Sequence, residues 1–218
     1  MKRLFGYDGI LTRASEIVTV FVLSNVLTLL CCIPVVTIGA ALAANQKVMQ
    51  DYVMQNSRAV LKTYFTAFWQ NLGKATAILL LFLITAVFLL ADFYFTFLFT
   101  SGVFALVLYI VLIVIFTLVL GIAACCLSLI VRYENTLGEH LRNCLYLLMS
   151  NVGRFILMAV IAAIPVVIFL LHPDTFIQLV PVWIFFGFSL LSYIQARLVK
   201  PMFETMDELP KTKDLTLA

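Results

Sequence analysis

Apolar residues dominate the chain in long runs, and short polar segments separate these runs. Runs of roughly 18 or more apolar residues with few charges are typical of membrane-spanning helices. Because the connections between the runs are short, we expect one all-α transmembrane domain over residues 1–218. The pattern predicts an integral membrane protein with six transmembrane helices, over residues 15–33, 35–53, 75–97, 103–131, 155–171 and 179–199.

Two other segments alternate apolar and polar positions with a helical period. In residues 57–72, apolar and aromatic side chains recur at i, i+3 and i+4 spacing, and Arg58 and Lys62 occupy the opposite face. Residues 136–149 show the same pattern, with Arg142 on the polar face. Helices of this kind lie in the plane of the membrane surface. The sequence therefore predicts two interfacial amphipathic helices.

The segment from Pro34 to Lys47 decides the topology. If this segment re-enters the membrane as a second helix, all fourteen Lys and Arg residues lie on one side of the bilayer. If it is an external loop, four basic residues fall on the opposite side, namely Lys47, Arg58, Lys62 and Lys74. Cytoplasmic segments of membrane proteins carry an excess of basic residues. We therefore expect a second span, with both termini and both amphipathic helices in the cytoplasm.

The composition agrees with a membrane protein and excludes several functions. Hydrophobic residues make up 64% of the 218 residues and charged residues 11%, whereas about 25% of a soluble domain is charged. The net charge of +3 reflects cytoplasmic Lys and Arg. No basic cluster is dense enough to neutralise a row of phosphates, so we expect no nucleic-acid partner. The expected surroundings are a lipid bilayer, with the basic residues on its cytoplasmic side.

Neither a catalytic centre nor a cofactor site is evident in the sequence. Four of the five cysteines form adjacent pairs inside apolar runs, and none has the spacing of zinc or redox sites. His172 and Asp174 share an external turn but lack a third metal ligand. Nucleotide-binding loops and Ser/His/Asp arrangements are also missing. The sequence therefore favours a protein that is not an enzyme, with no catalytic residues, no metal and no cofactor.

Four polar residues inside the apolar runs are candidate substrate-binding groups. An ionisable residue within a membrane is a functional candidate, and Asp92 lies in the outer part of the predicted span 75–97. It could bind a cation or a sugar hydroxyl, or it could be hydrated at the outer interface. Asn25, Asn45 and Gln46 could line a polar pathway, but hydrogen bonding between helices explains them equally well. Both interpretations stay open.

A short motif occurs twice. Residues 69–74 resemble residues 149–154, and each segment contains Asn-x-Gly followed by a basic residue. Each also sits between a predicted amphipathic helix and an outgoing span. This arrangement indicates either an internal repeat of the kind found in transporters or independent helix ends followed by an anchoring charge.

Two segments resemble the landmarks of a known bacterial family, YesL. Residues 30–41, which contain Pro-Val-Val-Thr-Ile-Gly-Ala, are similar to the first landmark. Residues 64–71 are similar to the second, although Trp69 and Gln70 replace its usual Phe-Lys pair. The biochemical function of this family is unknown, and its members are often encoded beside carbohydrate ABC importers and glycan-degrading enzymes. The resemblance implies a multi-pass protein of the bacterial cytoplasmic membrane that is linked to saccharide uptake.

Two functions therefore remain open. The first is a non-catalytic accessory or regulatory component of carbohydrate uptake, which would contact importer permeases. The second is a small stand-alone transporter or channel, alone or as a homo-oligomer. The candidate docking residues for a partner are Arg58, Lys62, Trp69 and Arg142.

Overall fold

The computed structural model describes residues 10–55 and 59–208, and every regular element in them is a helix. The short η1 is a 3-10 helix, and η2 is a π-helix. In chain order the elements are α2 (Ile10–Cys31), η1 (Val35–Thr37), α3 (Ile38–Met54), α4 (Val60–Phe99), α5 (Gly102–Ile130), α6 (Leu137–Ser150), α7 (Val152–Leu171), α8 (Pro173–Gln178), α9 (Val180–Val182), η2 (Trp183–Gly187) and α10 (Phe188–Glu208).

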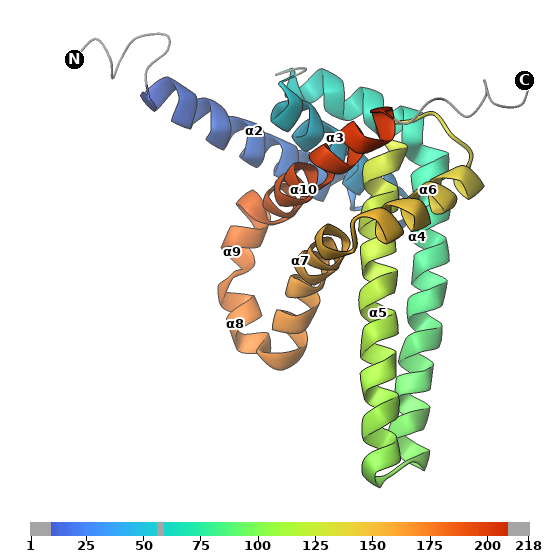
Figure 1. The fold of residues 1–218 in the computed structure, drawn as a ribbon. Helices are drawn as coiled ribbons and strands as arrows, with labels where there is room; N and C mark the ends of the chain where they lie inside the picture. The colour runs from blue at the N-terminus through green and yellow to red at the C-terminus, as the bar shows by residue number, and fades with distance from the viewer. Residues whose placement is uncertain (1–9, 56–58, 209–218) are drawn as a thin grey trace, which may run out of the picture.

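The helices form a wide upper part and a narrow lower part (Figure 1). The upper part contains α2, α3, α6, α10 and the first part of α4. The remainder of α4 descends beside α5 as a long hairpin, and α7 to α9 form a shorter hairpin next to it (Figure 1). The beginning of α2 and the end of α10 both lie in the upper part.

Within the described residues, four helical stretches are long and apolar enough to cross a membrane. They coincide with the last four predicted spans, and their bounds are Val60–Phe99, Gly102–Ile130, Val152–Phe169 and Val180–Glu204. Several such helices indicate a multi-pass membrane protein. The first two predicted spans, 15–33 and 35–53, correspond to α2 and α3, which are not among these four.

The predicted break between the amphipathic segment 57–72 and the span 75–97 is wrong. α4 continues through this region as one helix of 40 residues. The Asn71 side chain does not cap a helix end, because its Nδ2 donates to the Ala67 carbonyl one turn earlier, at 2.9 Å. Gly73 remains helical, with open space around it.

The second copy of the Asn-x-Gly motif behaves differently. α6 ends at Ser150 and α7 begins at Val152, so Asn151 lies at a true break between two helices. The two copies of the motif therefore differ in backbone conformation, which favours the interpretation that they arose independently. α6 itself coincides with the predicted amphipathic segment 136–149, and it begins with a capping box between Thr136 and Glu139.

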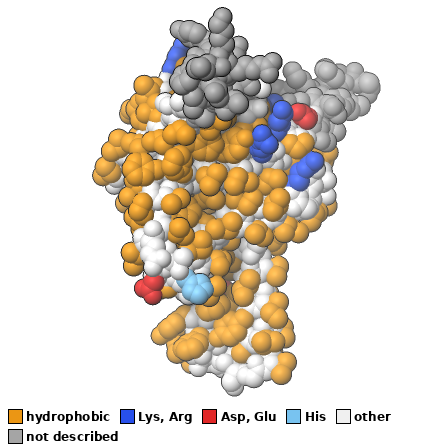
Figure 2. Space-filling model, turned by 90° about the vertical axis from the view of Figure 1, so that its left-hand side faces the viewer, with side chains coloured by type: hydrophobic (Ala, Val, Ile, Leu, Met, Phe, Trp, Pro, Cys, Tyr) orange, Lys and Arg blue, Asp and Glu red, His pale blue; other side chains and the backbone are white. Residues whose placement is uncertain are grey.

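The core lies in the upper part of the molecule, where small residues permit close helix packing. A Cβ atom at Gly121 of α5 would lie 2.7 Å from the Phe155 ring of α7. Ala43, Ala75 and Cys125 join α3, α4 and α5 in one buried cluster. By contrast, hydrophobic side chains cover the outside of the narrow lower part (Figure 2), as expected for helices surrounded by lipid.

Candidate functional site

A buried polar cluster around Asn45 lies at the centre of the upper part. The Ser24 hydroxyl of α2 donates to Oδ1 of Asn45, and the Ser189 hydroxyl of α10 donates to the same oxygen at 3.2 Å. Nδ2 of Asn45 donates to Oγ of Ser192 at 3.1 Å. Ser24, Asn45, Ser189 and Ser192 are all buried. One amide of α3 thus connects three helices.

Asn25 forms a second buried contact, between α2 and the π-helical turn η2. Its Nδ2 donates to the carbonyls of Trp183 at 2.9 Å and Ile184 at 2.7 Å, and its Oδ1 accepts from the Ser189 amide at 3.0 Å. A Cβ atom at Gly187 would meet the Trp183 ring, so glycine is required where the backbone widens. π-Helical turns are frequent at functional sites. Here the Trp183 and Ile184 carbonyls of the turn accept from Asn25.

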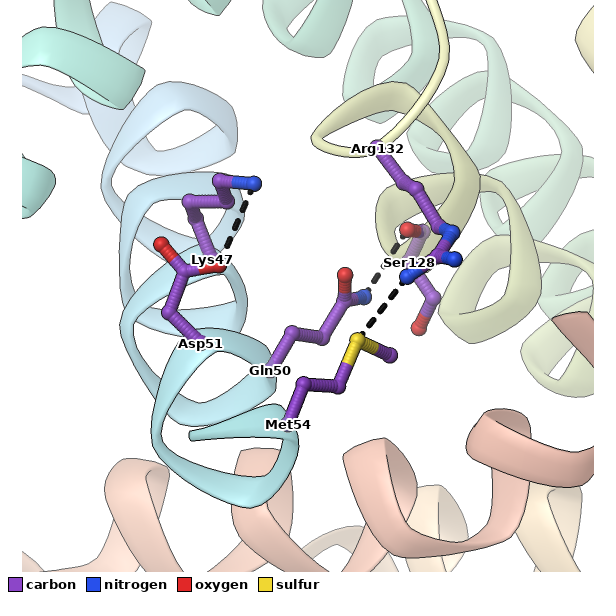
Figure 3. Close-up of polar contacts among 6 residues, drawn as sticks. All are labelled: Lys47, Gln50, Asp51, Met54, Ser128 and Arg132. Carbon is purple, nitrogen blue, oxygen red and sulfur yellow. Dashed lines mark hydrogen bonds and ion pairs between the residues drawn. The ribbon is translucent and has the colours of Figure 1, made fainter. Parts of the chain in front are cut away.

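A third group of polar contacts joins α3 to the end of α5 (Figure 3). Nε2 of Gln46 donates to Oγ of Ser128 at 2.9 Å, and Nε2 of Gln50 donates to the Ser128 carbonyl at 2.9 Å. Nearer the end of α3, Nη1 of Arg132 lies 2.8 Å from the sulfur of Met54.

The opposite side of α3 carries an ion pair. Nζ of Lys47 lies 3.3 Å from Oδ1 of Asp51 (Figure 3). Both side chains are largely shielded from solvent, and they lie in the second half of α3. Because charged groups are unfavourable in hydrocarbon unless they are paired, the pair permits this half of α3 to pack inside the protein.

Three of the four predicted substrate-binding residues therefore take part in buried contacts between helices, which we together call the polar seam. Asn25, Asn45 and Gln46 all donate to groups of neighbouring helices. A solute that bound here would have to replace these buried hydrogen bonds, and leaving a buried polar group unpaired costs about 1–3 kcal/mol. The arrangement is well suited to fixing helix positions. Sequence reasoning missed Gln50, Ser128, Ser189 and Ser192, whose partners lie far away in the chain.

Asp92 lies apart from this seam. It is exposed on the lower part of α4, where a groove of about 370 Å³ between α4 and α5 is lined by Asp92, Thr96 and Thr100 together with apolar side chains. Oγ1 of Thr96 donates to the Asp92 carbonyl at 2.8 Å. The groove is open to the surroundings and offers one carboxylate and two hydroxyls.

The candidate docking residues lie on the upper part where they are described. Arg58 falls outside the described residues. Trp69 is 71% exposed on α4, and Lys62 and Arg142 are also exposed. Lys62 and Glu16 line a depression of about 650 Å³ between α2 and the start of α4.

Sequence reasoning also overlooked His140 of α6. Its side chain is fully buried, and neither ring nitrogen has a hydrogen-bond partner among the described residues. Burial, reinforced by the Lys74 ammonium, lowers the pKa of His140 below its usual 6.5. The sequence does contain a sign that His140 is buried. His140, Cys144 and Leu147 recur at i, i+4 and i+7, and these three positions form the packed face of α6.

The turn of α6 that follows His140 carries a buried cysteine. Cys144, one turn later, places its sulfur 3.2 Å from that of Cys126. The described residues nevertheless contain no group of three His, Cys, Asp or Glu side chains arranged to hold a metal ion.

Comparison with known families gives a match over part of the polar seam. Residues 21–93 match a family of unknown function, DUF624. No curated protein and no solved structure matches the chain. The matched residues run from within α2 to within α4, so they contain Asn25, Asn45 and Gln46. They also contain both segments, 30–41 and 64–71, that carry the resemblance to the YesL family.

Proposed function

We propose that this protein is a YesL-type, non-catalytic component of the bacterial cytoplasmic membrane that assists or regulates carbohydrate uptake. The observation that carries the proposal is the use of the buried polar side chains. Asn25, Asn45 and Gln46 form hydrogen bonds between helices, whereas basic and aromatic side chains stay exposed on the upper part. Such a molecule can hold its own helices in place and present a surface to a partner.

The location of the exposed basic and aromatic side chains supports a cytoplasmic partner. Lys62, Trp69 and Arg142 lie on segments that the distribution of Lys and Arg assigns to the cytoplasm. The termini belong to the same side under this assignment. Trp and Arg are enriched in the energetically important parts of protein interfaces. A permease of a carbohydrate importer, which the YesL resemblance implies, is the proposed partner.

Affinity purification from the native membrane tests this function. The tagged protein, extracted in mild detergent from cells grown on glycans, should recover importer permeases in stoichiometric amounts. A Lys62→Glu/Trp69→Ala double variant should reduce the recovery about tenfold. Leu83→Ala, which changes an exposed apolar residue of α4, should not reduce it. Recovery of a homo-oligomer without any permease would contradict the proposal.

A stand-alone transporter is the second candidate, and the groove at Asp92 favours it. This groove combines a carboxylate with the Thr96 and Thr100 hydroxyls, which are groups that bind cations or sugar hydroxyls. In reconstituted vesicles, Asp92→Asn should then abolish solute flux. Asp174→Asn, which changes another exposed acid, is the matched control. Flux that is the same in both variants and the wild type would exclude a role for Asp92.

A further inference from the structure

The turn between α2 and α3 lies beside the beginning of the apolar part of α4. The Thr76 hydroxyl donates to the Val36 carbonyl at 2.9 Å. Gly39 packs directly against the same stretch, because a Cβ atom there would lie 2.5 Å from the Ala75 carbonyl oxygen. These contacts fix the turn next to residues 75–76.

Because the turn packs beside residues 75–76 of α4, the depth of these residues in the bilayer is also the depth of the turn. Lys74 is exposed immediately before this contact, and a Lys at the start of a span marks the polar boundary. From Thr76, α4 continues to Phe99, which is roughly 35 Å at a rise of 1.5 Å per residue. This length is enough to cross a hydrocarbon core of about 30 Å. The turn therefore lies near the inner boundary, a full membrane thickness away from the outer end of α4.

The other end of α3 leads to the same depth. Gln50 contacts Ser128 and Met54 contacts Arg132, at the end of α5 that the basic residues place in the cytoplasm. Ala43 shares a core cluster with Ala124 of α5. Ala124 lies about two helical turns before Arg132, which follows the end of α5. Since α3 has 17 residues and is about 25 Å long, it must be strongly inclined to α5, as Figure 1 shows.

The charged and polar residues of α3 are consistent with a helix that enters the membrane only part of the way. Lys47, Gln50 and Asp51 occupy its middle and second half, and Lys or Asp at the centre of a span costs about 2.5–3.5 kcal/mol each. The turn itself is apolar and unprotected, because Ile33 is 75% exposed and Val35 73% exposed, and neighbouring Leu30 and Val36 are also exposed. Beyond this contact, α4 also exposes apolar side chains, among them Leu80, Leu81 and Leu83.

We propose that the first helical hairpin, α2–η1–α3, enters the membrane from the cytoplasmic side and returns without crossing it. Leu30, Ile33, Val35 and Val36 then contact the acyl chains of the cytoplasmic leaflet. Four segments cross the bilayer instead of six, namely α4, α5, α7 and the segment from α9 into α10. Both termini stay in the cytoplasm, because the number of crossings remains even.

Labelling from outside the cell separates the two topologies. Variants that each add one cysteine, Val35→Cys and Ser101→Cys, are treated in intact cells with a membrane-impermeant maleimide. Mass spectrometry of the peptides then distinguishes the added cysteine from the native ones. Ser101, between α4 and α5, should be labelled. We expect labelling at position 35 to be at least tenfold lower. Equal labelling would restore the six-span topology without affecting the proposed docking function.

A depth measurement gives a positive result for the same turn. A fluorophore on Val35→Cys, in reconstituted vesicles, should be quenched by lipids that carry spin labels on their acyl chains and hardly by aqueous iodide. The fluorophore on Ser101→Cys should show the opposite preference. Strong iodide quenching at position 35, or efficient cross-linking of two Val35→Cys copies, would overturn lipid as the occupant. Native Cys32, on the same turn, permits the labelling test in the unaltered chain.

Discussion

At the scale of single residues, Asn45 connects the hydroxyl side chains of two neighbouring helices. Its amide satisfies the hydroxyls of Ser24, Ser189 and Ser192 inside the protein. Asn45→Ala should therefore lower the free energy of unfolding by about 1–3 kcal/mol, because three buried hydroxyls lose a partner. Unfolding of the purified protein in detergent measures this change. Gln70→Ala, at an exposed position, should change stability by less than about 0.5 kcal/mol.

His140 predicts a dependence of stability on pH. Because burial lowers its pKa below 6.5 in the folded protein, the unfolded chain binds a proton more readily than the folded chain does. The stability that comes from a neutral His140 is complete above about pH 6.5, and it is lost as the pH falls from 6.5 towards the lower folded-state pKa. His140→Leu should remove this part of the slope.

Thermal unfolding at several pH values between 5 and 8 tests this expectation. The wild type and the His140→Leu variant should differ in slope below pH 6.5 and run parallel above it. Identical slopes in the two proteins would show that His140 titrates normally.

At the scale of elements, the contact between the first hairpin and α4 depends on one glycine. Gly39→Ala would place a methyl group 2.5 Å from the Ala75 carbonyl oxygen. Since backbone must move to accommodate it, we expect a loss of about 1–3 kcal/mol. Gly73→Ala is the matched control, because a Cβ atom there has open space. It should stabilise α4 by roughly 0.5–1 kcal/mol, so unfolding should shift in opposite directions for the two variants.

The continuity of α4 shows which elements the sequence could predict. Long apolar runs predicted the positions of α5 and α7 closely, because apolar character extends over their whole length. Asn71 and Gly73 resembled a helix end, yet the packing of Tyr64, Phe68 and Ala75 against neighbouring helices keeps the backbone helical. Local propensity is a weak signal where tertiary contacts oppose it.

The sequence also could not predict the depth of the first hairpin, and here the reason is different. The turn around Val35 contains no charged residue, so the distribution of Lys and Arg is the same whether this turn reaches the outer surface or stops in the inner leaflet. Only a contact between distant residues, such as Val36 with Thr76, gives its position. The polar seam was partly predictable, since Asn25 and Asn45 interrupt apolar runs, but their serine partners in α10 resemble ordinary surface positions.

At the scale of the whole molecule, the long hairpin predicts sensitivity to bilayer thickness. From Lys74 to Phe99, α4 is about 39 Å long, and its apolar side chains are mostly exposed. In nanodiscs, stability should rise as the acyl chains lengthen from 14 to about 20 carbons, by a fraction of a kcal/mol for each Å of mismatch removed. The melting temperature as a function of chain length measures this effect. A constant melting temperature would contradict lipid contact along the hairpin.

The taper of the molecule has a consequence for the membrane itself. Seen in Figure 1, α2, α3 and α10 add to the cross-section of the upper part, whereas only the two hairpins extend below it. With the first hairpin in the cytoplasmic leaflet, the protein occupies more area in that leaflet than in the outer one. Outer-leaflet lipids must fill the difference, so each copy acts as a wedge that favours curvature with the cytoplasmic leaflet on the convex side.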